Sequence, residues 1–312
     1  MKNFINTDHI DDILTLAREG LRLKTAEGKI QPGMGKVLTC LYLNPSLRTR
    51  LSTEIAARKL GMDCINLAAD SAWKLETRTG VVMDGDAAEH IKEQAEVLSR
   101  YSDIIAIRAF PHLQDADEDY HDDFISRFAR YCDTPILNLE SGSLHPLQGL
   151  ADLMTIEETK KQDRPKIVLT WAPHPRKLPQ SVANSFSRTI QQAGYELTIA
   201  CPQGMELADQ YLGNARVVHD QDEALEGADF VYAKNWSSFH TYGQIMLNRS
   251  DWTVTKAKMD RTNNGRFMHC LPVRRNVVVA DEVLDSPSSL VGEQAENRIY
   301  AAQIVLQKLL GS

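Results

Sequence analysis

Along most of this chain, runs of consecutive apolar residues alternate with stretches in which apolar residues recur every three or four positions. The runs have the length of buried strands, and the periodic stretches have the pattern of helices with one buried face. A helix is expected first, over residues 8–23, followed by a loop over 28–35. Strands are then expected over 36–43, 63–67, 103–107 and 135–139, with helices over 49–60, 87–100 and 120–131 between them.

The same alternation restarts after His145 and Pro146. Regular alternation of strands and helices is typical of a parallel sheet that is covered on both faces. We therefore predict an α/β protein with two doubly wound parallel-sheet domains, at residues 1–145 and 146–292, and a cleft between them. In the second half, strands are expected over 166–170, 196–200, 216–218, 230–232 and 266–269, and helices over 147–160, 182–193, 205–212, 222–226 and 293–310.

Length and charge narrow the class of protein. A chain of 312 residues is long enough for two domains, each with its own core. The net charge of −7 gives no basic surface for nucleic acid or an anionic membrane. The N-terminus lacks the apolar core of a signal peptide, and no run of about 18 apolar residues occurs. A soluble, cytoplasmic protein is expected.

The five cysteines are widely separated and lack the spacing of metal ligands. They are interpreted as reduced thiols of a cytoplasmic protein, and neither a metal site nor a cofactor is predicted.

The segment 43–50, Leu-Asn-Pro-Ser-Leu-Arg-Thr-Arg, joins the end of a predicted strand to the start of a predicted helix. Ser46 is a good N-cap, and the free N–H groups of a helix start favour an anion. Arg48 and Arg50 add planar guanidinium groups that fit phosphate oxygens two at a time. The alternative is a capped surface helix with solvated arginines. The rest of the chain favours an anion site.

Polar residues follow several other predicted strands, and ligands of open parallel sheets bind at the carboxyl ends of the strands. A doubly wound fold therefore brings these residues to one cleft. They are Arg108, Glu140, His145, Gln148, His174, Lys234 and Cys270.

Three of these segments carry a family resemblance. The Ser-x-Arg-Thr-Arg at 46–50 resembles the carbamoyl-phosphate loop of the aspartate and ornithine carbamoyltransferases. His-Pro-Leu-Gln at 145–148 and His-Cys-Leu-Pro at 269–272 are similar to two further motifs of that family, in the same order and at similar spacing. The resemblance covers the chain from about Val37 onward. It implies transfer of a carbamoyl group to an amine, a homotrimer, and a C-terminal helix, 293–312, that packs back on the first domain.

The resemblance also implies a site for carbamoyl phosphate. Ser46, Leu47, Arg48 and Thr49 would bind the phosphate, and Arg108 would add a second guanidinium. His145 would donate to the carbamoyl oxygen, and Gln148 would hold the carbamoyl amide; alone, His145 could equally be a loop histidine with its bonds satisfied. The implied site also includes Arg298 and Trp73, the latter on a loop that reaches a neighbouring subunit's site in the similar subfamily.

The turn at 269–272 is the implied counterpart in the second domain. The Cys270 thiol and the Leu271 carbonyl would lie beside the attacking amine, and the alternative for Cys270 is a buried residue before a rigid turn. A nucleophilic cysteine is disfavoured, because carbamoyl phosphate is already a mixed anhydride. The predicted catalytic set is Arg48, Arg108, His145, Gln148, Cys270 and Leu271.

Lys234 indicates which amine accepts the carbamoyl group. The ornithine enzymes typically carry Asp-x-Trp-x-Ser-Met-Gly after the corresponding strand, whereas this chain reads Tyr-Ala-Lys-Asn-Trp-Ser-Ser at 232–238. A lysine there repels an α-ammonium group and attracts a carboxylate. The stretches 73–77, 83–85, 171–175 and 262–264 resemble the N-acylornithine carbamoyltransferases, and the N-succinylornithine members more than the N-acetylornithine members.

N-succinylornithine brings two carboxylates, where N-acetylornithine brings one. We expect Lys234 with Arg274 to bind one, and His174 with Arg176 to bind the other. Ala88 lies in the loop that discriminates between acyl groups. At this position the family resemblance implies Pro in the succinyl enzymes and Glu in the acetyl enzymes, and Ala88 matches neither. Glu140 resembles a glutamate near the acyl amide; its alternative is a solvated loop carboxylate. N-acetylornithine therefore stays open as the acceptor.

Two other classes of protein share features with this pattern. A nicotinamide dehydrogenase is disfavoured, because no Gly-x-Gly-x-x-Gly follows any predicted strand. A non-catalytic anion-binding protein stays open, because a cleft with arginines also describes a binding module.

Overall fold

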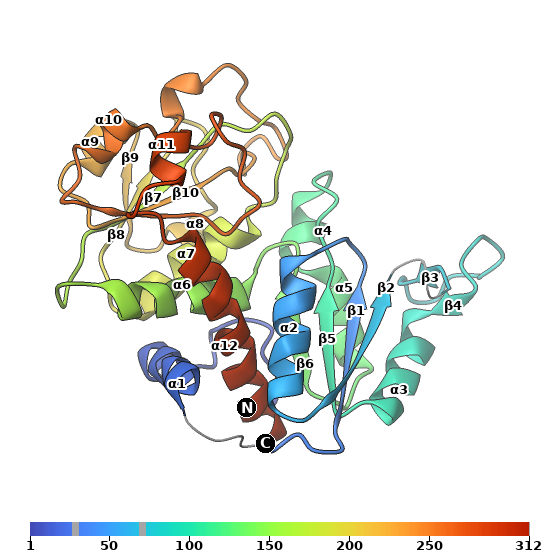
Figure 1. Ribbon diagram of the computed structural model, residues 1–312. Coiled ribbons are helices and arrows are strands. Elements are labelled where there is room, and N and C mark those ends of the chain that lie inside the picture. The colour runs from blue at the N-terminus through green and yellow to red at the C-terminus, as the bar shows by residue number, and fades with distance from the viewer. Residues whose placement is uncertain (27–30, 69–72, 312) are drawn as a thin grey trace.

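Two separate parallel sheets organise the chain in the computed structural model, which describes residues 1–26, 31–68 and 73–311 (Figure 1). The first sheet has the order β2 (Asp63–Ala68), β1 (Val37–Tyr42), β5 (Ile104–Arg108), β6 (Ile136–Glu140). The second has the order β11 (Arg266–Met268), β10 (Phe230–Lys234), β7 (Ile167–Trp171), β8 (Leu197–Ala200), β9 (Arg216–Val218). The predicted α/β fold class is confirmed, and the strands expected from the sequence are all present.

The strand orders explain why the polar loops meet. Neighbours β1 and β5 in the first sheet are followed by connections that run to opposite sides, and so are β7 and β10 in the second. Such a switch in direction leaves a crevice at the carboxyl ends of the strands, where ligands of these folds bind. The segments 43–48 and 172–180 and the residues after Lys234 lie at these crevices.

Helices cover the sheets, as buried parallel strands require. The first sheet carries α2 (Arg48–Lys59), α3 (Ile91–Tyr101), α4 (Ala116–Tyr120) and α5 (Asp123–Arg130). The second carries α7 (Ser181–Gln192), α8 (Asp209–Leu212), α9 (Gln221–Leu225), η2 (Ser250–Trp252), α10 (Lys256–Met259) and α11 (Asp281–Leu284).

Four predicted helices have the wrong bounds. The first begins at Ile13 instead of residue 8, because the Asp12 side chain caps the Thr15 N–H. The helix expected over 120–131 divides into α4 and α5, since Asp122 takes a positive φ of 49°. Residues 205–208 are not helical, and α8 begins after an extended Ala208. Residues 87–90 are also not helical.

Residues 87–90 belong instead to an arm that the sequence did not predict. Here β4 (Glu89–His90) pairs with β3 (Leu75–Glu76) in a small parallel ladder, at the right of Figure 1. The His90 side chain then caps α3 by accepting from the Lys92 N–H at 3.1 Å. A two-residue strand has no periodicity to detect, because pairing with a distant segment defines it.

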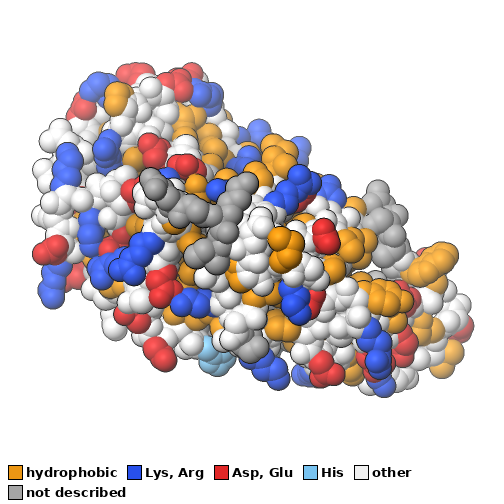
Figure 2. Space-filling view, turned by 60° about the horizontal axis from the view of Figure 1, so that its bottom comes forward, with side chains coloured by type: hydrophobic (Ala, Val, Ile, Leu, Met, Phe, Trp, Pro, Cys, Tyr) orange, Lys and Arg blue, Asp and Glu red, His pale blue; other side chains and the backbone are white. Residues whose placement is uncertain are grey.

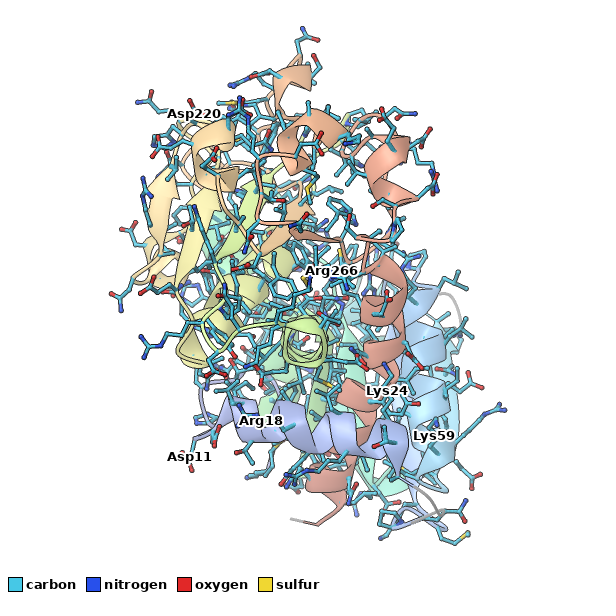
Figure 3. The ribbon with its side chains drawn as sticks, turned by 60° about the vertical axis from the view of Figure 1, so that its left-hand side comes forward. Asp11, Arg18, Lys24, Lys59, Asp220 and Arg266 are labelled. Carbon is cyan, nitrogen blue, oxygen red and sulfur yellow. The ribbon has the colours of Figure 1, made fainter. Side chains whose placement is uncertain are left out.

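Three helices join the two halves. The helix α6 (Pro146–Thr159) packs against α12 (Val291–Leu310) and α7, and α12 packs against α2. The expected return of the C-terminal helix to the first domain is therefore confirmed. The helix α1 (Ile13–Thr25) crosses both α6 and α12, and its labelled Arg18 and Lys24 face them in Figure 3. Arg18 lies 3.2 Å from Glu157, and Lys24 lies 2.8 Å from Glu158.

The surface agrees with the absence of a basic field in the sequence. Acidic and basic side chains are interspersed on the face seen in Figure 2. Within the described residues, no helix has the length and apolarity needed to cross a membrane. All five cysteines are free, as expected. The division of the chain at residue 145, with 293–312 assigned to the first domain, stays a proposal.

A buried carboxyl group ties α6 to α12. Asp152 is fully buried, and its Oδ1 accepts from the Nε2 atoms of Gln148 at 2.7 Å and Gln294 at 2.8 Å. Burial raises the pKa of Asp152 from 3.8 to about 7, although the hydrogen bonds from the two glutamines oppose this rise. The carboxyl group therefore binds a proton on folding at mildly acid pH.

This raised pKa predicts how stability depends on pH. Between pH 3.8 and about 7 the folded chain holds a proton on Asp152 that the unfolded chain has lost, so stability falls as pH rises through this range and levels off above it. In Asp152→Asn, Oδ1 still accepts from both glutamines, and the titration is gone. The unfolding free energy of wild type minus that of the variant, measured in urea at a series of pH values, should fall by a few kcal/mol across this range. A constant difference would contradict the prediction.

Candidate active site

Segments from both sheets and from α6 and α12 line one cleft of about 380 Å³. The strand ends converge there, as the strand orders require. Most of the predicted site residues are among its lining, namely Ser46, Leu47, Arg48, Thr49, Arg108, Glu140, His145, Gln148, His174, Lys234, Cys270, Leu271 and Arg298.

The turn between β1 and α2 forms one wall. The Ser46 Oγ accepts from the Thr49 N–H at 3.3 Å, so Ser46 caps the helix start as predicted, although the regular helix begins at Arg48. Arg48 lines the cleft. Arg50, predicted as a second guanidinium for the anion, is not in the lining and lies over the Tyr42 ring, 5.5 Å from its centroid. Two residues apart on a helix, the side chains point in different directions, so that part of the prediction was wrong.

Arg298 on α12 connects this turn to α6. It is 7% exposed, and it donates to the Thr49 hydroxyl at 2.6 Å and to the Gln148 Oε1 at 2.7 Å. Both partners are neutral, so the guanidinium charge is not cancelled by them. Because Asp152 holds the Gln148 Nε2, both ends of the Gln148 amide are fixed, and Oε1 keeps a second lone pair for a ligand.

A second buried arginine pairs with the one carboxylate of the lining. The Arg108 Nη1 lies 2.5 Å from the Glu140 Oε2 and donates to the Thr49 hydroxyl at 3.2 Å. The Ser181 hydroxyl donates to the other Glu140 oxygen at 2.8 Å. Glu140 is thus a buried, partnered carboxylate, and the alternative of a solvated loop residue is wrong.

His145 lies beside this pair and is neutral. Its Nε2 is 3.5 Å from the Glu140 Oε2, and its side chain is almost completely buried. Burial, and then the positive charges of Arg298, Arg108 and Lys234, hold the pKa of His145 well below its usual range. A neutral imidazole has one N–H to donate to a developing oxyanion and adds no charge of its own.

The 269–272 turn forms the opposite wall. The Gln294 Oε1 accepts from the His269 N–H at 2.8 Å, and the His269 Nδ1 accepts from the Leu271 N–H at 2.9 Å. Leu271 takes a positive φ of 56°, a conformation that costs a non-glycine residue about 1–3 kcal/mol. Burial raises the pKa of the Cys270 thiol, so this residue is a thiol at neutral pH and not a nucleophile.

The four residues predicted to bind the two acceptor carboxylates lie near one another. Lys234 lines the cleft, but Arg274 contacts His174, with its Nε donating to the His174 Nε2 at 3.0 Å. The His174 Nδ1 lies 2.8 Å from the Arg176 carbonyl oxygen. Burial, and then the positive charges of Arg274, Lys234 and Arg176, lower the pKa of His174.

Besides Arg50, four predicted site residues lie outside the lining: Trp73, Ala88, Arg176 and Arg274. Trp73 is 71% exposed and lies at the base of the β3–β4 arm, on which Ala88 also lies. The Ala88 N–H donates to the carbonyl of Lys74, the residue after Trp73, at 3.1 Å. The backbone segments that carry Trp73 and Ala88 therefore lie side by side. The fold of one chain does not bring this arm to its own cleft.

Several residues of the cleft lining were not predicted from the sequence. Ser181 begins α7 and could have been found from its place after Pro179, at the start of a predicted helix that follows a strand. The others are mostly apolar and carry no chemical signal in the sequence; they are Phe110, Leu178, Pro179 and Val182.

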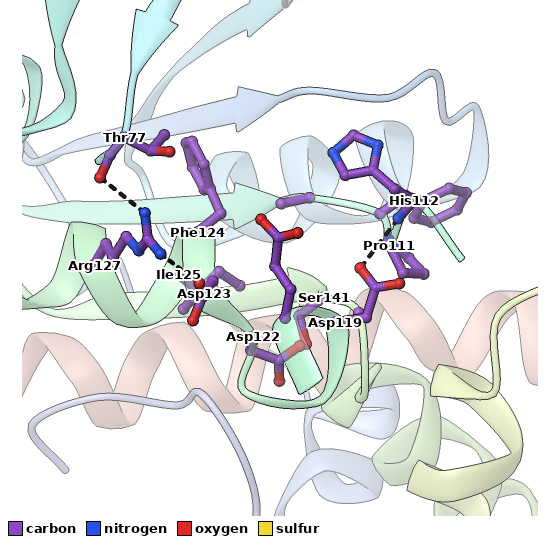
Figure 4. Close-up of a pocket in the computed structure, with 14 residues that line it drawn as sticks. Thr77, Pro111, His112, Asp119, Asp122, Asp123, Phe124, Ile125, Arg127 and Ser141 are labelled. Carbon is purple, nitrogen blue, oxygen red and sulfur yellow. Dashed lines mark hydrogen bonds and ion pairs between the residues drawn. The ribbon is translucent and has the colours of Figure 1, made fainter. Parts of the chain in front are cut away.

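A smaller hollow of about 140 Å³ lies beside the arm and is shown in Figure 4. Arg127 there donates to the Thr77 carbonyl at 3.0 Å and to Asp123 at 2.6 Å, so it fastens the arm to α5. Asp119 accepts from the His112 N–H at 3.1 Å. Most charged residues of this hollow are acidic, which makes it a poor site for an anion.

The electrostatics of the larger cleft favour an anionic ligand. Its lining has four permanent cations, Arg48, Arg108, Lys234 and Arg298, and one carboxylate, Glu140. Of the two buried cations, Arg108 is paired with Glu140, whereas Arg298 has neutral hydrogen-bond partners, and burying uncompensated charge costs several kcal/mol. An anion that enters the cleft recovers part of this cost.

Known proteins resemble the chain over its whole length. The profile of the carbamoyl-phosphate-binding domain of aspartate/ornithine carbamoyltransferases matches residues 2–158, and that of the Asp/Orn-binding domain matches 178–309. The N-succinylornithine carbamoyltransferase of Bacteroides thetaiotaomicron is 46% identical, with 99% of each chain covered. The N-acetylornithine carbamoyltransferase of Xanthomonas campestris is 37% identical, with 100% of this chain and 98% of the other covered.

A solved structure agrees with these matches. A glutamate-to-alanine mutant of N-acetyl-L-ornithine transcarbamylase, complexed with carbamyl phosphate and N-succinyl-L-norvaline, superposes with a TM-score of 0.93. It is 36% identical, and 99% of this chain and 100% of that chain are covered.

Arg48 and Arg50 form a matched pair for testing the anion site. Arg48→Ala removes a cation from the cleft, and Arg50→Ala removes one from the other side of the same helix turn. We expect Arg48→Ala to weaken binding of inorganic phosphate by about 1.5–3 kcal/mol, or roughly 10- to 100-fold, as measured by calorimetry. Arg50→Ala should bind within about twofold of wild type. Equal effects of the two substitutions would mean that general surface charge, not the cleft, attracts phosphate.

Proposed function

Since this chain belongs to the aspartate/ornithine carbamoyltransferase family, we propose that it transfers the carbamoyl group of carbamoyl phosphate to the δ-amine of N-succinyl-L-ornithine, giving N-succinyl-L-citrulline and phosphate in arginine biosynthesis. The alternative acceptor is N-acetyl-L-ornithine. The observation that carries the proposal is the cationic cleft with a neutral His145 among its arginines.

The leaving phosphate would bind between the β1–α2 turn and the two buried arginines. Arg48 and the N–H groups at the start of α2 face the same cleft as Arg108 and Arg298. Charge grows on the phosphate as the carbamoyl–oxygen bond breaks, and cations already fixed in place stabilise that charge without reorganisation. Arg298 is held by Thr49 and Gln148, so it is preorganised for this role.

The carbamoyl group would lie toward His145 and Gln148. The His145 N–H would donate to the carbamoyl oxygen, which becomes negative when the amine attacks, and the free lone pair of the Gln148 Oε1 would accept from the carbamoyl amide. The acceptor amine must lose its proton before it attacks. The Leu271 carbonyl, on the opposite wall, would accept from that amine and orient it.

The balance of charge in and around the cleft indicates which acyl group the acceptor carries. With Glu140 paired to Arg108, the remaining charge of the lining suits a phosphate dianion and one carboxylate. The second carboxylate of N-succinylornithine needs a cation from beyond the lining, and Arg176 and Arg274 both adjoin His174. By this count the lining alone would serve N-acetylornithine, and the two flanking arginines favour the succinyl group.

The β3–β4 arm supports the proposal of a homotrimer. Large apolar side chains are exposed along it, with Trp73 at 71%, Val82 at 82% and Met83 at 41%. Exposed apolar side chains gathered on one projecting element are typical of a protein contact. In a cyclic trimer each arm would reach the next chain's cleft and bring Trp73 to its carbamoyl phosphate and Ala88 to its acyl group. An alanine in place of glutamate is compatible with a succinyl ligand in the solved mutant transcarbamylase. A cytoplasmic location is part of the same proposal.

A parallel assay of three acceptors tests the function. With carbamoyl phosphate, kcat/KM should be highest for N-succinylornithine, lower for N-acetylornithine and lowest for ornithine, whose α-ammonium would be repelled by Lys234.

Arg176→Ala should lower kcat/KM for N-succinylornithine by about 2–5 kcal/mol of transition-state stabilisation and leave kcat/KM for N-acetylornithine nearly unchanged, because the shorter acyl group has no carboxylate to lose. Lys177→Ala, a neighbouring exposed cation, serves as the control. If none of the three acceptors is carbamoylated, a non-catalytic binding protein is favoured. If Arg176→Ala lowers kcat/KM equally for both acylated substrates, Arg176 does not bind the acyl group.

Mixed trimers test the shared site. Trp73→Ala and Arg48→Ala chains should each be nearly inactive alone. After the two are denatured together and refolded, about one quarter of the sites should draw Arg48 from one chain and Trp73 from the next, and activity should return to that level. Absence of recovery in trimers shown to contain both chains would indicate that each chain builds its site alone.

A further inference from the structure

A second group of chemically reactive side chains lies at the carboxyl end of the second sheet, outside the cleft lining. Cys201 directly follows β8, and His219 directly follows β9. The residues before them, Ala200 and Val218, are partners in the ladder, and the Cys201 N–H donates to the Val218 carbonyl at 3.1 Å. The register of two parallel strands therefore places a thiol and an imidazole side by side.

Glu206 completes the group from the turn after β8. One potential ligand atom from each of Cys201, Glu206 and His219 lies within 4.8 Å of the other two. The Glu206 Oε1 is 3.5 Å from the His219 Nε2 and accepts from the Gly204 N–H at 3.1 Å. A backbone hydrogen bond thus orients the carboxylate toward the imidazole.

The His219 ring has a fixed tautomer. Its Nδ1 lies 2.9 Å from the Cys201 carbonyl oxygen, which only accepts, so Nδ1 carries the proton. The lone pair is then on Nε2, the nitrogen that faces Glu206. Metal-binding histidines are usually held in this way, with the second ring nitrogen donating to a carbonyl or carboxylate.

We propose that Cys201, Glu206 and His219 form a binding site for a divalent transition metal of the Zn²⁺ class. A thiolate, an imidazole and a carboxylate are the donors that Zn²⁺ takes in proteins, whereas Mg²⁺ and Ca²⁺ prefer oxygen ligands alone. A water molecule or His240, whose Nε2 is 3.9 Å from the Glu206 Oε2, would complete a tetrahedron. The His219 side chain is about half exposed, which leaves a path for the ion.

A simpler interpretation is a surface cluster in which Glu206 pairs with the two histidines. It leaves the buried thiol without a role. The Cys201 Sγ is fully buried and lies within 4.8 Å of a ligand atom from each of the other two residues. A bound divalent ion supplies a charge opposite to that of a thiolate, and the thiol proton leaves to solvent as the metal–sulfur bond forms.

A bound metal would stiffen the part of the molecule that is built on the second sheet. The turn that carries Glu206 already holds the segment after β10, since the Trp236 Nε1 donates to the Met205 carbonyl at 2.7 Å and the Ser238 hydroxyl donates to the Gly204 carbonyl at 2.9 Å. This segment begins after Lys234, a residue of the cleft. In Figure 3 the labelled Asp220, the residue after His219, marks the position of the cluster at the outer edge of the second sheet. The metal site is independent of the proposed carbamoyl transfer.

Cobalt substitution tests the site. The full-length protein, reduced and freed of metal by dialysis against a chelator, is titrated with Co²⁺ and followed by absorption. We expect one equivalent of Co²⁺ per chain to give a thiolate-to-cobalt charge-transfer band together with the visible bands of tetrahedral cobalt, and Zn²⁺ to displace it. Zn²⁺ should also raise the melting temperature of the apo protein.

Variants assign the ligands. Cys201→Ser should abolish the charge-transfer band, and His219→Ala should weaken Zn²⁺ binding at least about tenfold without disturbing the fold, because this side chain is half exposed. Cys132→Ser, at a free thiol of the first domain, should bind like wild type. Cys270→Ser should also keep the band. If the band is absent from wild type, or is lost in Cys270→Ser and kept in Cys201→Ser, the proposal is wrong, and in the second case the metal lies in the cleft.

Discussion

Two buried guanidinium groups at one cleft are the feature on which the functional half of this structure depends. Arg298 has only neutral hydrogen-bond partners, and Arg108 is paired with Glu140, the one carboxylate of the cleft lining. Burial of such charge costs several kcal/mol, which the packing of α6, α12 and α2 must offset. The consequence is a site that is already polarised for an anion before the ligand arrives. Burial, and then that same charge, holds the pKa of His145 well below its usual range, so the environment that forms the phosphate site also keeps the hydrogen-bond donor neutral.

The network behind the cleft connects its two walls. Asp152 accepts from Gln148 on one side and from Gln294 on the other, and Gln294 in turn holds the backbone of His269. A single buried carboxyl group therefore links the residue proposed for the carbamoyl amide to the turn proposed for the acceptor amine. Hydrogen-bond networks of this kind restrict the rotamers of the residues that face a ligand, and catalysis requires such restriction.

The arm presents the opposite case. The Arg127 bond to the Thr77 carbonyl holds it to α5, and its large apolar side chains are exposed. In a single chain this exposure has no compensating gain. It is explained if another chain covers the arm, as the proposed trimer requires.

The sequence by itself determined the two-sheet fold and most of the cleft. Apolar runs mark buried parallel strands, and residues that follow such strands must meet at one edge, which is why Arg108, His145 and Lys234 could be placed without coordinates. Tertiary structure decided what periodicity does not encode. Arg50 lies over the Tyr42 ring and not in the cleft lining, the Arg274 side chain donates to His174, and the β3–β4 pairing has no local signal. The grouping of Cys201, Glu206 and His219 likewise arises from strand register, because residues far apart in the chain become neighbours only when two strands pair.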